Sequence, residues 1–229
     1  MALQDGRLAV ASVPGVDACT LRDRVRRRHS PRVGIERIVG IQEALVLFTR
    51  GSTLRSTLEY LGHVLSPTAL ETVLERLSPS DRMLVEGAAV TADVPYEVAL
   101  NLWRSADIAL APIDPQWAER AGAEAIRVRG MQLYGGLLLK PSPEEFLAQH
   151  ISLFQRYYRP GDMKVAERAA GRATARLIGF EPGDNLFCRR LSGGWLAAIT
   201  IAGGKAPVVN HARCVMEGDP FCEWEVKWR

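Results

Sequence analysis

Apolar residues recur at helical spacing through the first two thirds of the chain, and this spacing predicts a series of helices. Leu54, Leu58 and Leu61 form one apolar stripe, and the Ser66-Pro67 pair predicts a further helix with Ser66 as its N-cap. The stripes on either side consist of Ile41, Ala44, Leu45 and Phe48, and of Val98, Leu102 and Ile108. Most of residues 35–125 is therefore predicted to be helical.

The second half of the chain mixes two kinds of pattern. Helical spacing continues over residues 131–139, 143–158 and 163–178, the last of which is rich in Ala and Arg. Short apolar runs then predict strands at residues 185–191, 194–201, 208–215 and 221–227, joined by turns at glycine pairs. These features predict an α+β fold, in which an N-terminal helical region packs on a C-terminal antiparallel sheet arranged as a meander.

The start of the chain differs from the rest, so we expect an N-terminal arm over residues 1–34 and a single helix-plus-sheet domain over residues 35–229. Residues 8–13 are typical of one short strand. A basic segment follows, with arginines at positions 22, 24, 26, 27, 28 and 32. Such a segment can contact phosphates or an acidic partner, or it can be a solvated helix face. The net charge of +3 and the lack of interleaved aromatic residues argue against a nucleic-acid partner.

Composition limits the class of protein. With 229 residues, of which 47% are hydrophobic, the chain can bury a large core. No apolar stretch reaches the roughly 18 residues that span a bilayer, and the start lacks the basic and apolar regions of a signal peptide. Because three of the four cysteines stand at metal-ligand spacing, we expect a reducing compartment, the cytoplasm, in place of a disulfide framework.

The most informative pattern lies in the last forty-two residues. Cys188 precedes a segment in which His211, Cys214 and Cys222 follow closely, and the Glu-Gly-Asp-Pro sequence between the last two cysteines predicts a reversal of the chain. Three thiolates and one imidazole are a ligand set for a closed, four-coordinate zinc ion. We therefore predict that Cys188, His211, Cys214 and Cys222 bind a structural zinc, which pins the final hairpin.

Three alternatives to this site stay open. The cysteines can be small buried core residues, or they can be redox thiols, although no C-x-x-C pair supports that reading. Without His211 as a ligand, the zinc would have a vacant position for catalysis. Cys19 stands apart from the set. Arg189, Arg190 and Arg213 are candidates to offset the negative charge of the zinc site.

This cysteine pattern also resembles a known family. Cys188, twenty-five intervening residues, and then Cys-x-x-x-Gly-x-Pro-x-Cys from Cys214 to Cys222 is similar to the 4-vinyl-reductase domain family. The family includes the sensor domains of phenol-responsive transcription activators, and its fold is related to haem-nitric-oxide-binding domains and to transport-particle subunits of vesicle tethering. In the phenol sensors an acidic residue holds the fourth zinc position, where this chain has His211.

The resemblance implies a ligand pocket between helices and sheet, near the metal. His150 lies on the apolar face of the helix predicted over residues 143–158, with Phe146, Phe154 and Tyr157, and Trp195 is the further aromatic candidate. His150 is either the polar anchor of this pocket or a core histidine with satisfied hydrogen bonds. We expect a small hydrophobic or aromatic ligand. Phenol itself is not implied, because the family's phenol-contacting residues have no matching positions here.

Catalytic and haem-binding motifs are lacking. The sequence has no P-loop, no G-x-S-x-G and no H-E-x-x-H, so the chain is predicted to be a binding protein rather than an enzyme. A haem would need His150 as its axial ligand, and the Tyr-x-Ser-x-Arg signature of nitric-oxide sensors is absent. Zinc is therefore the one cofactor that we expect.

Three functions remain. The first is a stand-alone, zinc-stabilised sensor domain that binds a small hydrophobic molecule and signals through a separate regulatory protein. The second is a scaffold of transport-particle-like fold without a ligand. The third, an enzyme acting on a tetrapyrrole or another hydrophobic substrate, rests on the family's name alone. Because related domains dimerise through helices, we also expect a homodimer.

Overall fold

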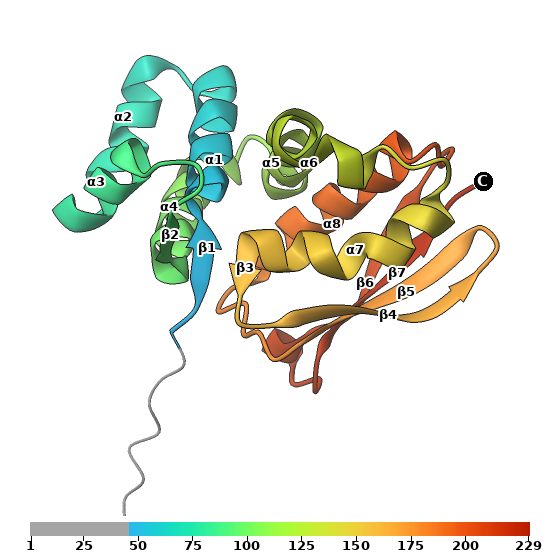
Figure 1. The fold of residues 1–229 in the computed structure, drawn as a ribbon. Helices are drawn as coiled ribbons and strands as arrows, with labels where there is room; N and C mark the ends of the chain where they lie inside the picture. Colours follow the sequence, from blue (N-terminus) through green and yellow to red (C-terminus); the bar gives the residue numbers. More distant parts are fainter. Residues whose placement is uncertain (1–45) are drawn as a thin grey trace, which may run out of the picture. The chain divides into compact units, whose positions relative to one another are not determined.

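The computed structural model describes residues 46–229, with the backbone but not the side chains of residues 149–152. These residues lie within one compact unit, Ala44–Arg229. The predicted N-terminal arm, its strand, its basic segment and Cys19 lie outside the described residues. The architecture is α+β with antiparallel sheets, as the sequence predicts (Figure 1). No helix within the described part of the chain has both the length and the apolar character that a bilayer crossing requires.

Helices account for most of the described chain, and three of them begin with the same local signal. Ser66, Ser78 and Ser142 each accept a hydrogen bond from a backbone N–H in the first helical turn. Each serine is followed by a proline, whose backbone nitrogen carries no hydrogen and therefore needs no acceptor. The described helices are α1 (Gly51–Val64), α2 (Pro67–Glu75), α3 (Pro79–Gly87), α4 (Tyr96–Leu110), α5 (Trp117–Ala125), the π-helical turn η1 (Ile126–Gly130), α6 (Met131–Leu138), α7 (Pro143–Tyr157), α8 (Asn185–Ile201) and the 3-10 turn η2 (Val215–Glu217).

The strands form two antiparallel sheets. They are β1 (Phe48–Arg50), β2 (Asp93–Pro95), β3 (Tyr158–Arg159), β4 (Asp162–Ala169), β5 (Arg172–Ile178), β6 (Val208–Arg213) and β7 (Cys222–Lys227). The small sheet has the order β2-β1-β3, and the larger has the order β4-β5-β7-β6. Helix α8 connects the two hairpins of the larger sheet, and α7 and α8 both pack against that sheet (Figure 1).

The helix predicted over residues 163–178 is wrong, because this segment is the β4–β5 hairpin. Its Ala and Arg content favours a helix, but its burial alternates with the period of a strand. In β5, Ala173, Ala175 and Leu177 are buried and the residues between them are more exposed. A period of two places one face on the core, so tertiary packing overrides the helical propensity here.

The strands predicted at residues 185–191 and 194–201 are also wrong, because both belong to α8. The meander is therefore incorrect: β7 pairs with β5 after the α8 connection. The strands predicted near the C-terminus are confirmed as β6 and β7. Two residues that were predicted to lie on apolar helix stripes also differ from the prediction. Phe48 lies in strand β1, and Ile108 is 62% exposed.

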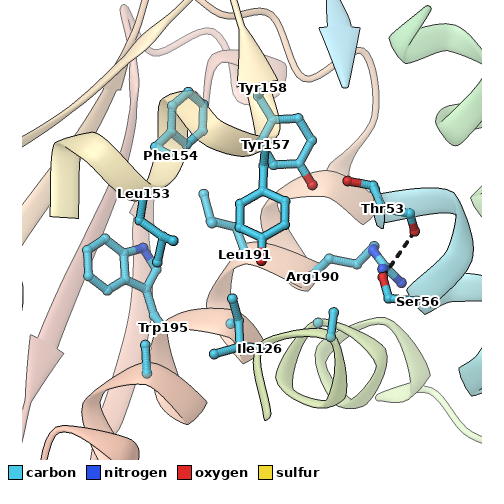
Figure 2. A pocket seen from close by; sticks show the side chains of 14 residues that line it. Thr53, Ser56, Ile126, Leu153, Phe154, Tyr157, Tyr158, Arg190, Leu191 and Trp195 are labelled. Carbon is cyan, nitrogen blue, oxygen red and sulfur yellow. Dashed lines mark hydrogen bonds between the residues drawn. The ribbon is translucent and has the colours of Figure 1, made fainter. Parts of the chain in front are cut away.

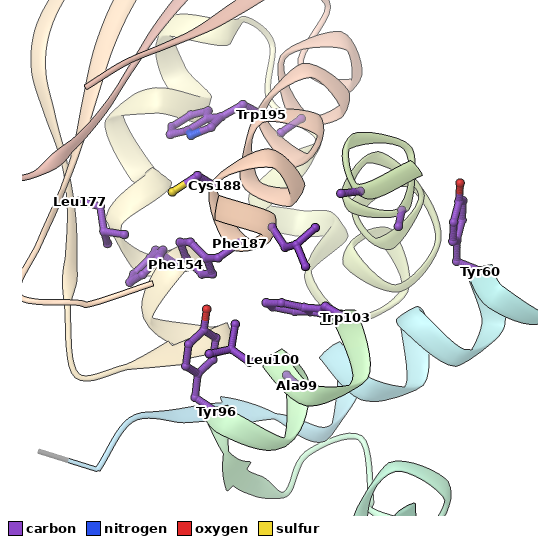
Figure 3. Close-up of a cluster of buried hydrophobic side chains, with 14 of the residues drawn as sticks. Tyr60, Tyr96, Ala99, Leu100, Trp103, Phe154, Leu177, Phe187, Cys188 and Trp195 are labelled. Atoms are coloured by element: carbon purple, nitrogen blue, oxygen red, sulfur yellow. The ribbon is translucent and has the colours of Figure 1, made fainter. Parts of the chain in front are cut away.

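The core contains a cluster of aromatic rings where α4, α7 and α8 meet. Tyr96 contacts Phe180 edge to face with ring centroids 5.0 Å apart, and Phe180 stacks on Phe187 at 5.0 Å. Tyr158 packs edge to face against Phe187 at 5.1 Å. Figure 3 shows Tyr96, Phe187 and Cys188 within this core. Aromatic pairs of this kind add to the stabilisation from area burial, and they fix ring orientation.

Helices α5 and α8 approach so closely that their backbones touch. A Cβ atom on Gly122 would lie 1.9 Å from the carbonyl oxygen of Arg190, and one on Gly193 would lie 1.8 Å from that of Glu119. Only glycine fits at either position. The glycines at residues 193–194 predicted a turn, but they lie inside α8, and Gly193 is required by this helix crossing. Arg189 reinforces it by pairing with Glu119 at 2.8 Å.

We expect Gly193→Ala to lower the free energy of unfolding by about 3 kcal/mol, because α5 and α8 must separate to admit the methyl group. Gly62, in α1, is the matched control, since a Cβ there meets nothing within 4 Å. Gly62→Ala is expected to stabilise by about 0.5–1 kcal/mol through helix propensity. Urea unfolding followed by circular dichroism measures both. Equal effects of the two substitutions would contradict the close crossing.

Candidate functional site

The structure brings the four predicted metal ligands together. One ligand atom from each of Cys188, His211, Cys214 and Cys222 lies within 4.8 Å of the others. The three thiols are buried and free of disulfides, and the Sγ atoms of Cys188 and Cys222 are 3.7 Å apart. Two sulfurs bound to one tetrahedral zinc at about 2.3 Å would lie about 3.8 Å apart, whereas a disulfide needs about 2.05 Å. The cluster could therefore hold a metal ion.

A tight turn returns the chain from Cys214 to Cys222. The carbonyl of Cys214 accepts hydrogen bonds from the backbone N–H groups of Glu217 and Asp219. The Asp219 carboxylate in turn accepts a hydrogen bond of 2.9 Å from the N–H of Cys214. This is the reversal that the Glu-Gly-Asp-Pro sequence predicts. Cys188 reaches the cluster from a helix, α8, and not from a strand as expected.

A second set of contacts holds the histidine against α8. The imidazole of His211 stacks on Trp224 with ring centroids 4.7 Å apart, and the Trp224 indole N–H donates to Ser192 Oγ at 2.9 Å. Ser192 Oγ donates at 3.0 Å to the carbonyl of Cys188. The Nε2 atom of His211 is buried and has no hydrogen-bond partner among the described residues. An unpartnered ring nitrogen beside three thiols fits the donor set of a metal site.

The thiols influence one another's ionisation. A hydrogen bond with the Cys188 thiol is the main reason that the pKa of Cys222 falls to about 4, with His211 contributing less. Its contact with Cys222 raises the pKa of Cys188, and burial is the main cause that raises the pKa of Cys214. The ionisation of each thiol therefore depends on its neighbours in the cluster.

The three arginines expected beside the metal site have other partners. Arg189 pairs with Glu119 of α5, and Arg213 lies 3.7 Å from Glu223. Arg190 points the other way from α8, where its guanidinium lies over the Trp103 ring at 4.7 Å. Arg189 and Arg190 lie on α8 and Arg213 lies on β6, so the partner of each guanidinium depends on how these elements pack.

A cavity of about 80 Å³ lies between α1, α5, α7 and α8. Its walls are mainly apolar, and Figure 2 shows the labelled lining side chains around it. The lining residues are Thr53, Ser56, Gly122, Ala125, Ile126, Leu153, Phe154, Tyr157, Tyr158, Arg190, Leu191, Gly194, Trp195 and Ala198. The volume exceeds what one water occupies, about 10–15 Å³, and is below the roughly 300 Å³ at which drug-sized pockets begin.

The predicted pocket residues divide into three groups. Phe154, Tyr157 and Trp195 line the cavity. Phe146 does not line it, but is buried behind it with its ring 6.3 Å from that of Trp195. His150 lies in α7, and its side chain is outside the described part. The sequence interpretation missed the α1 hydroxyls of Thr53 and Ser56, because helical spacing marked α1 only by its leucine stripe.

Two cavity-lining residues carry buried polar atoms without a hydrogen-bond partner in the described structure. These atoms are the Tyr157 hydroxyl and Nη1 of Arg190. Burial is the main cause that raises the pKa of Tyr157, so this phenol stays protonated and can donate. An unmet polar group in an apolar site carries a free-energy cost. The cavity thus combines apolar walls with two unsatisfied donors.

In the ligand-free protein, we expect Tyr157→Phe to raise the free energy of unfolding by about 1 kcal/mol, because it removes a buried hydroxyl that bonds to nothing. Tyr96 is the matched control, since its hydroxyl is buried and donates to the Pro182 carbonyl at 2.9 Å. Tyr96→Phe is expected to cost about 1 kcal/mol. Urea denaturation of both variants gives the comparison. A loss of stability in Tyr157→Phe equal to that in Tyr96→Phe would show that its hydroxyl has a partner.

Comparison with known proteins identifies the fold. No family model matches the sequence. No curated protein matches it either. Solved structures do match, and H-NOX proteins are among them. The Fe(II) unliganded H-NOX protein from K. algicida aligns with a TM-score of 0.60 at 11% identity, covering 79% of this chain and 96% of that one. The H-NOX domain from Shewanella oneidensis, in its Fe(II)CO state, gives 0.60 at 13% identity, covering 79% and 98%.

Two of the matching structures concern haem: one its distortion in the H-NOX family, the other its redox potential. The cavity of this chain, at about 80 Å³, is too small for a macrocycle that needs a pocket in the range of several hundred Å³. His150, the axial ligand that a haem would need, belongs to α7, and its side chain lies outside the described part. The chain therefore has the fold of H-NOX domains, and the volume of its described cavity is below that of a haem pocket.

Proposed function

We propose that this chain is a binding domain of the sensor type, which holds a small hydrophobic or aromatic molecule in the cavity between α1, α5, α7 and α8. The observation that carries the proposal is the cavity itself, an apolar space with two unsatisfied polar groups at its wall. Apolar walls with a few fixed polar groups are the usual form of a small-molecule site. The likeness in fold to H-NOX sensors is consistent with this function but does not by itself establish it.

A structural zinc bound by Cys188, His211, Cys214 and Cys222 forms the second part of the proposal. The convergence of four donor atoms and the 3.7 Å separation of two sulfurs support it. With four protein ligands the site is closed, so the zinc would stabilise the fold instead of binding substrate. It would join α8 to the β6–β7 hairpin, and its binding energy would contribute directly to folding.

The 4-vinyl-reductase domain family remains the family that we propose. The Cys-x-x-x-Gly-x-Pro-x-Cys segment supports the proposal, because it folds into the turn that places Cys214 beside Cys222. The relation in fold between that family and H-NOX domains agrees with the structural matches. A homodimer, a regulatory protein partner and a cytoplasmic location are further elements of the proposal.

The competing function is a scaffold of transport-particle-like fold that binds no ligand. That alternative predicts a solid core. A cavity and buried donors without partners both lower the stability of the fold. A bound ligand would offset this loss in a binding domain, whereas a scaffold without a ligand would not recover it, so the cavity favours the binding domain.

Replacing Cys214 or Cys222 by Ser is expected to remove the zinc and to lower the melting temperature by about 10 °C or more, since the metal then no longer joins hairpin and helix. Native mass spectrometry and elemental analysis give the metal content, expected to be one zinc per chain in the parent protein. Cys19→Ser, outside the predicted ligand set, is the control and should retain the metal. Retention of zinc by both site variants would refute the assignment.

Native mass spectrometry also tests the cavity. We expect the freshly purified protein to carry an organic mass in addition to zinc, and the Ala198→Leu variant to lack that mass because the larger side chain fills the cavity. Gly135→Ala, on α6 with no atom within 4 Å of the new Cβ, is the control that should retain it. An organic mass that persists in the Ala198→Leu variant would place the ligand elsewhere. If neither the parent protein nor the Gly135→Ala control carried an organic mass, the scaffold function would be favoured.

A further inference from the structure

Arg190 is a buried cation with few partners. Its relative exposure is 6%, although arginine is among the residues least often buried without a paired charge. Nη2 donates to Thr57 Oγ1 at 3.1 Å, and the guanidinium lies over the Trp103 ring at 4.7 Å. Nη1 has no hydrogen-bond partner within the described structure. Figure 2 shows the side chain extending along the cavity from α8 toward Ser56 and Thr53 of α1.

No carboxylate of residues 46–229 forms an ion pair with this guanidinium; the ion pairs of the neighbouring Arg189 and of Arg104 use Glu119, Glu97 and Asp184. Burial lowers the pKa of Arg190 to about 10, so the side chain remains charged at neutral pH. The ionisable groups that act in the opposite direction are tyrosine hydroxyls. One hydrogen bond and one cation–π contact only partly replace the lost hydration of a guanidinium.

The missing partner must be an acceptor. Arg190 has only donors, and the protonated Tyr157 hydroxyl is a second donor without an acceptor. The nearby hydroxyls of α1 bond within the chain and do not accept from Nη1: Thr53 Oγ1 accepts from Thr49 at 2.9 Å, and Ser56 Oγ donates to the Thr53 carbonyl at 3.1 Å. A guanidinium and a phenol at one cavity match the two oxygens of a carboxylate.

We propose that the ligand of this cavity is a small monocarboxylic acid, whose carboxylate pairs with Arg190 and Tyr157 and whose apolar part packs on Ile126, Leu153 and Trp195. The inference rests on the proposed binding function and specifies its ligand class. The volume of about 80 Å³ limits the apolar part to a single ring or a short chain. A monoanion is favoured over a phosphate dianion, because one buried cation cannot neutralise two charges.

The experiment compares acids with neutral molecules of the same shape. Benzoate and hexanoate are titrated against the zinc-loaded full-length protein by isothermal calorimetry, alongside benzyl alcohol and hexanol. The acids are expected to bind at least about tenfold more tightly, because only they supply a charged acceptor. Equal binding of acids and alcohols would overturn the inference and leave the cavity function standing.

The variant that isolates the charge is Arg190→Met. It is expected to weaken binding of the acids by about tenfold or more and binding of the alcohols by less than about threefold. Arg189→Met is the matched control, since its guanidinium pairs with Glu119 and does not line the cavity, and it should leave all four affinities unchanged. Retention of the preference for acids by Arg190→Met would overturn the inference.

Folding of the variants is checked by circular dichroism before each titration. Arg190→Met is expected to fold, because it replaces an unpaired buried cation by an apolar side chain of similar length. If Arg190→Met does not fold, Tyr157→Phe provides a second test of the inference. It is expected to lower the affinity for the acids by about fivefold and to leave the affinity for the alcohols unchanged. Ala198→Leu separates the proposal that the cavity binds a ligand from the proposal that the ligand is a carboxylic acid. If this variant binds every probe as the parent does, the cavity is not the binding site and the proposed function also fails.

Discussion

The backbones of α5 and α8 touch at Gly122 and Gly193, and this contact sets the position of everything that α8 carries. A side chain at either glycine would separate the two helices. Helix packing normally leaves 8–10 Å between axes, filled by side chains, so a crossing at which Cβ atoms do not fit is unusually close. It brings the α8 side chains near α1 and α4, and it forms one wall of the cavity.

Helix α8 serves two sites at once. A helix turns by about 100° per residue, so Cys188 and Arg190 point to nearly opposite faces. Cys188 faces the β6–β7 hairpin and its cluster, whereas Arg190 faces Thr57 and Trp103. The Ser192–Trp224 hydrogen bond ties the same helix to the sheet. A metal that joined Cys188 to the hairpin would therefore also fix the helix from which Arg190 extends.

Sequence reasoning succeeded where the signal was local. The Ser66-Pro67 pair marked the start of α2, and the turn between Cys214 and Cys222 follows from its own residues. It failed where the role of a residue depends on contact with backbone that is distant in the sequence. Gly193 is a turn residue in isolation and a packing residue once α5 lies against it. With α8 read as two strands, the neighbours of Arg190 could not be foreseen.

Likeness in fold to H-NOX proteins extends over 79% of this chain, yet the described cavity is smaller than a haem pocket. The difference lies in chemistry that a fold does not determine. A haem site needs a broad apolar slot. This cavity instead offers a guanidinium and a phenol, both short of an acceptor. Neither donor has a protein acceptor in the described structure, and buried polar groups without a partner are often functional. The unmet hydrogen bonds therefore say more about function than the similarity of the helices around them.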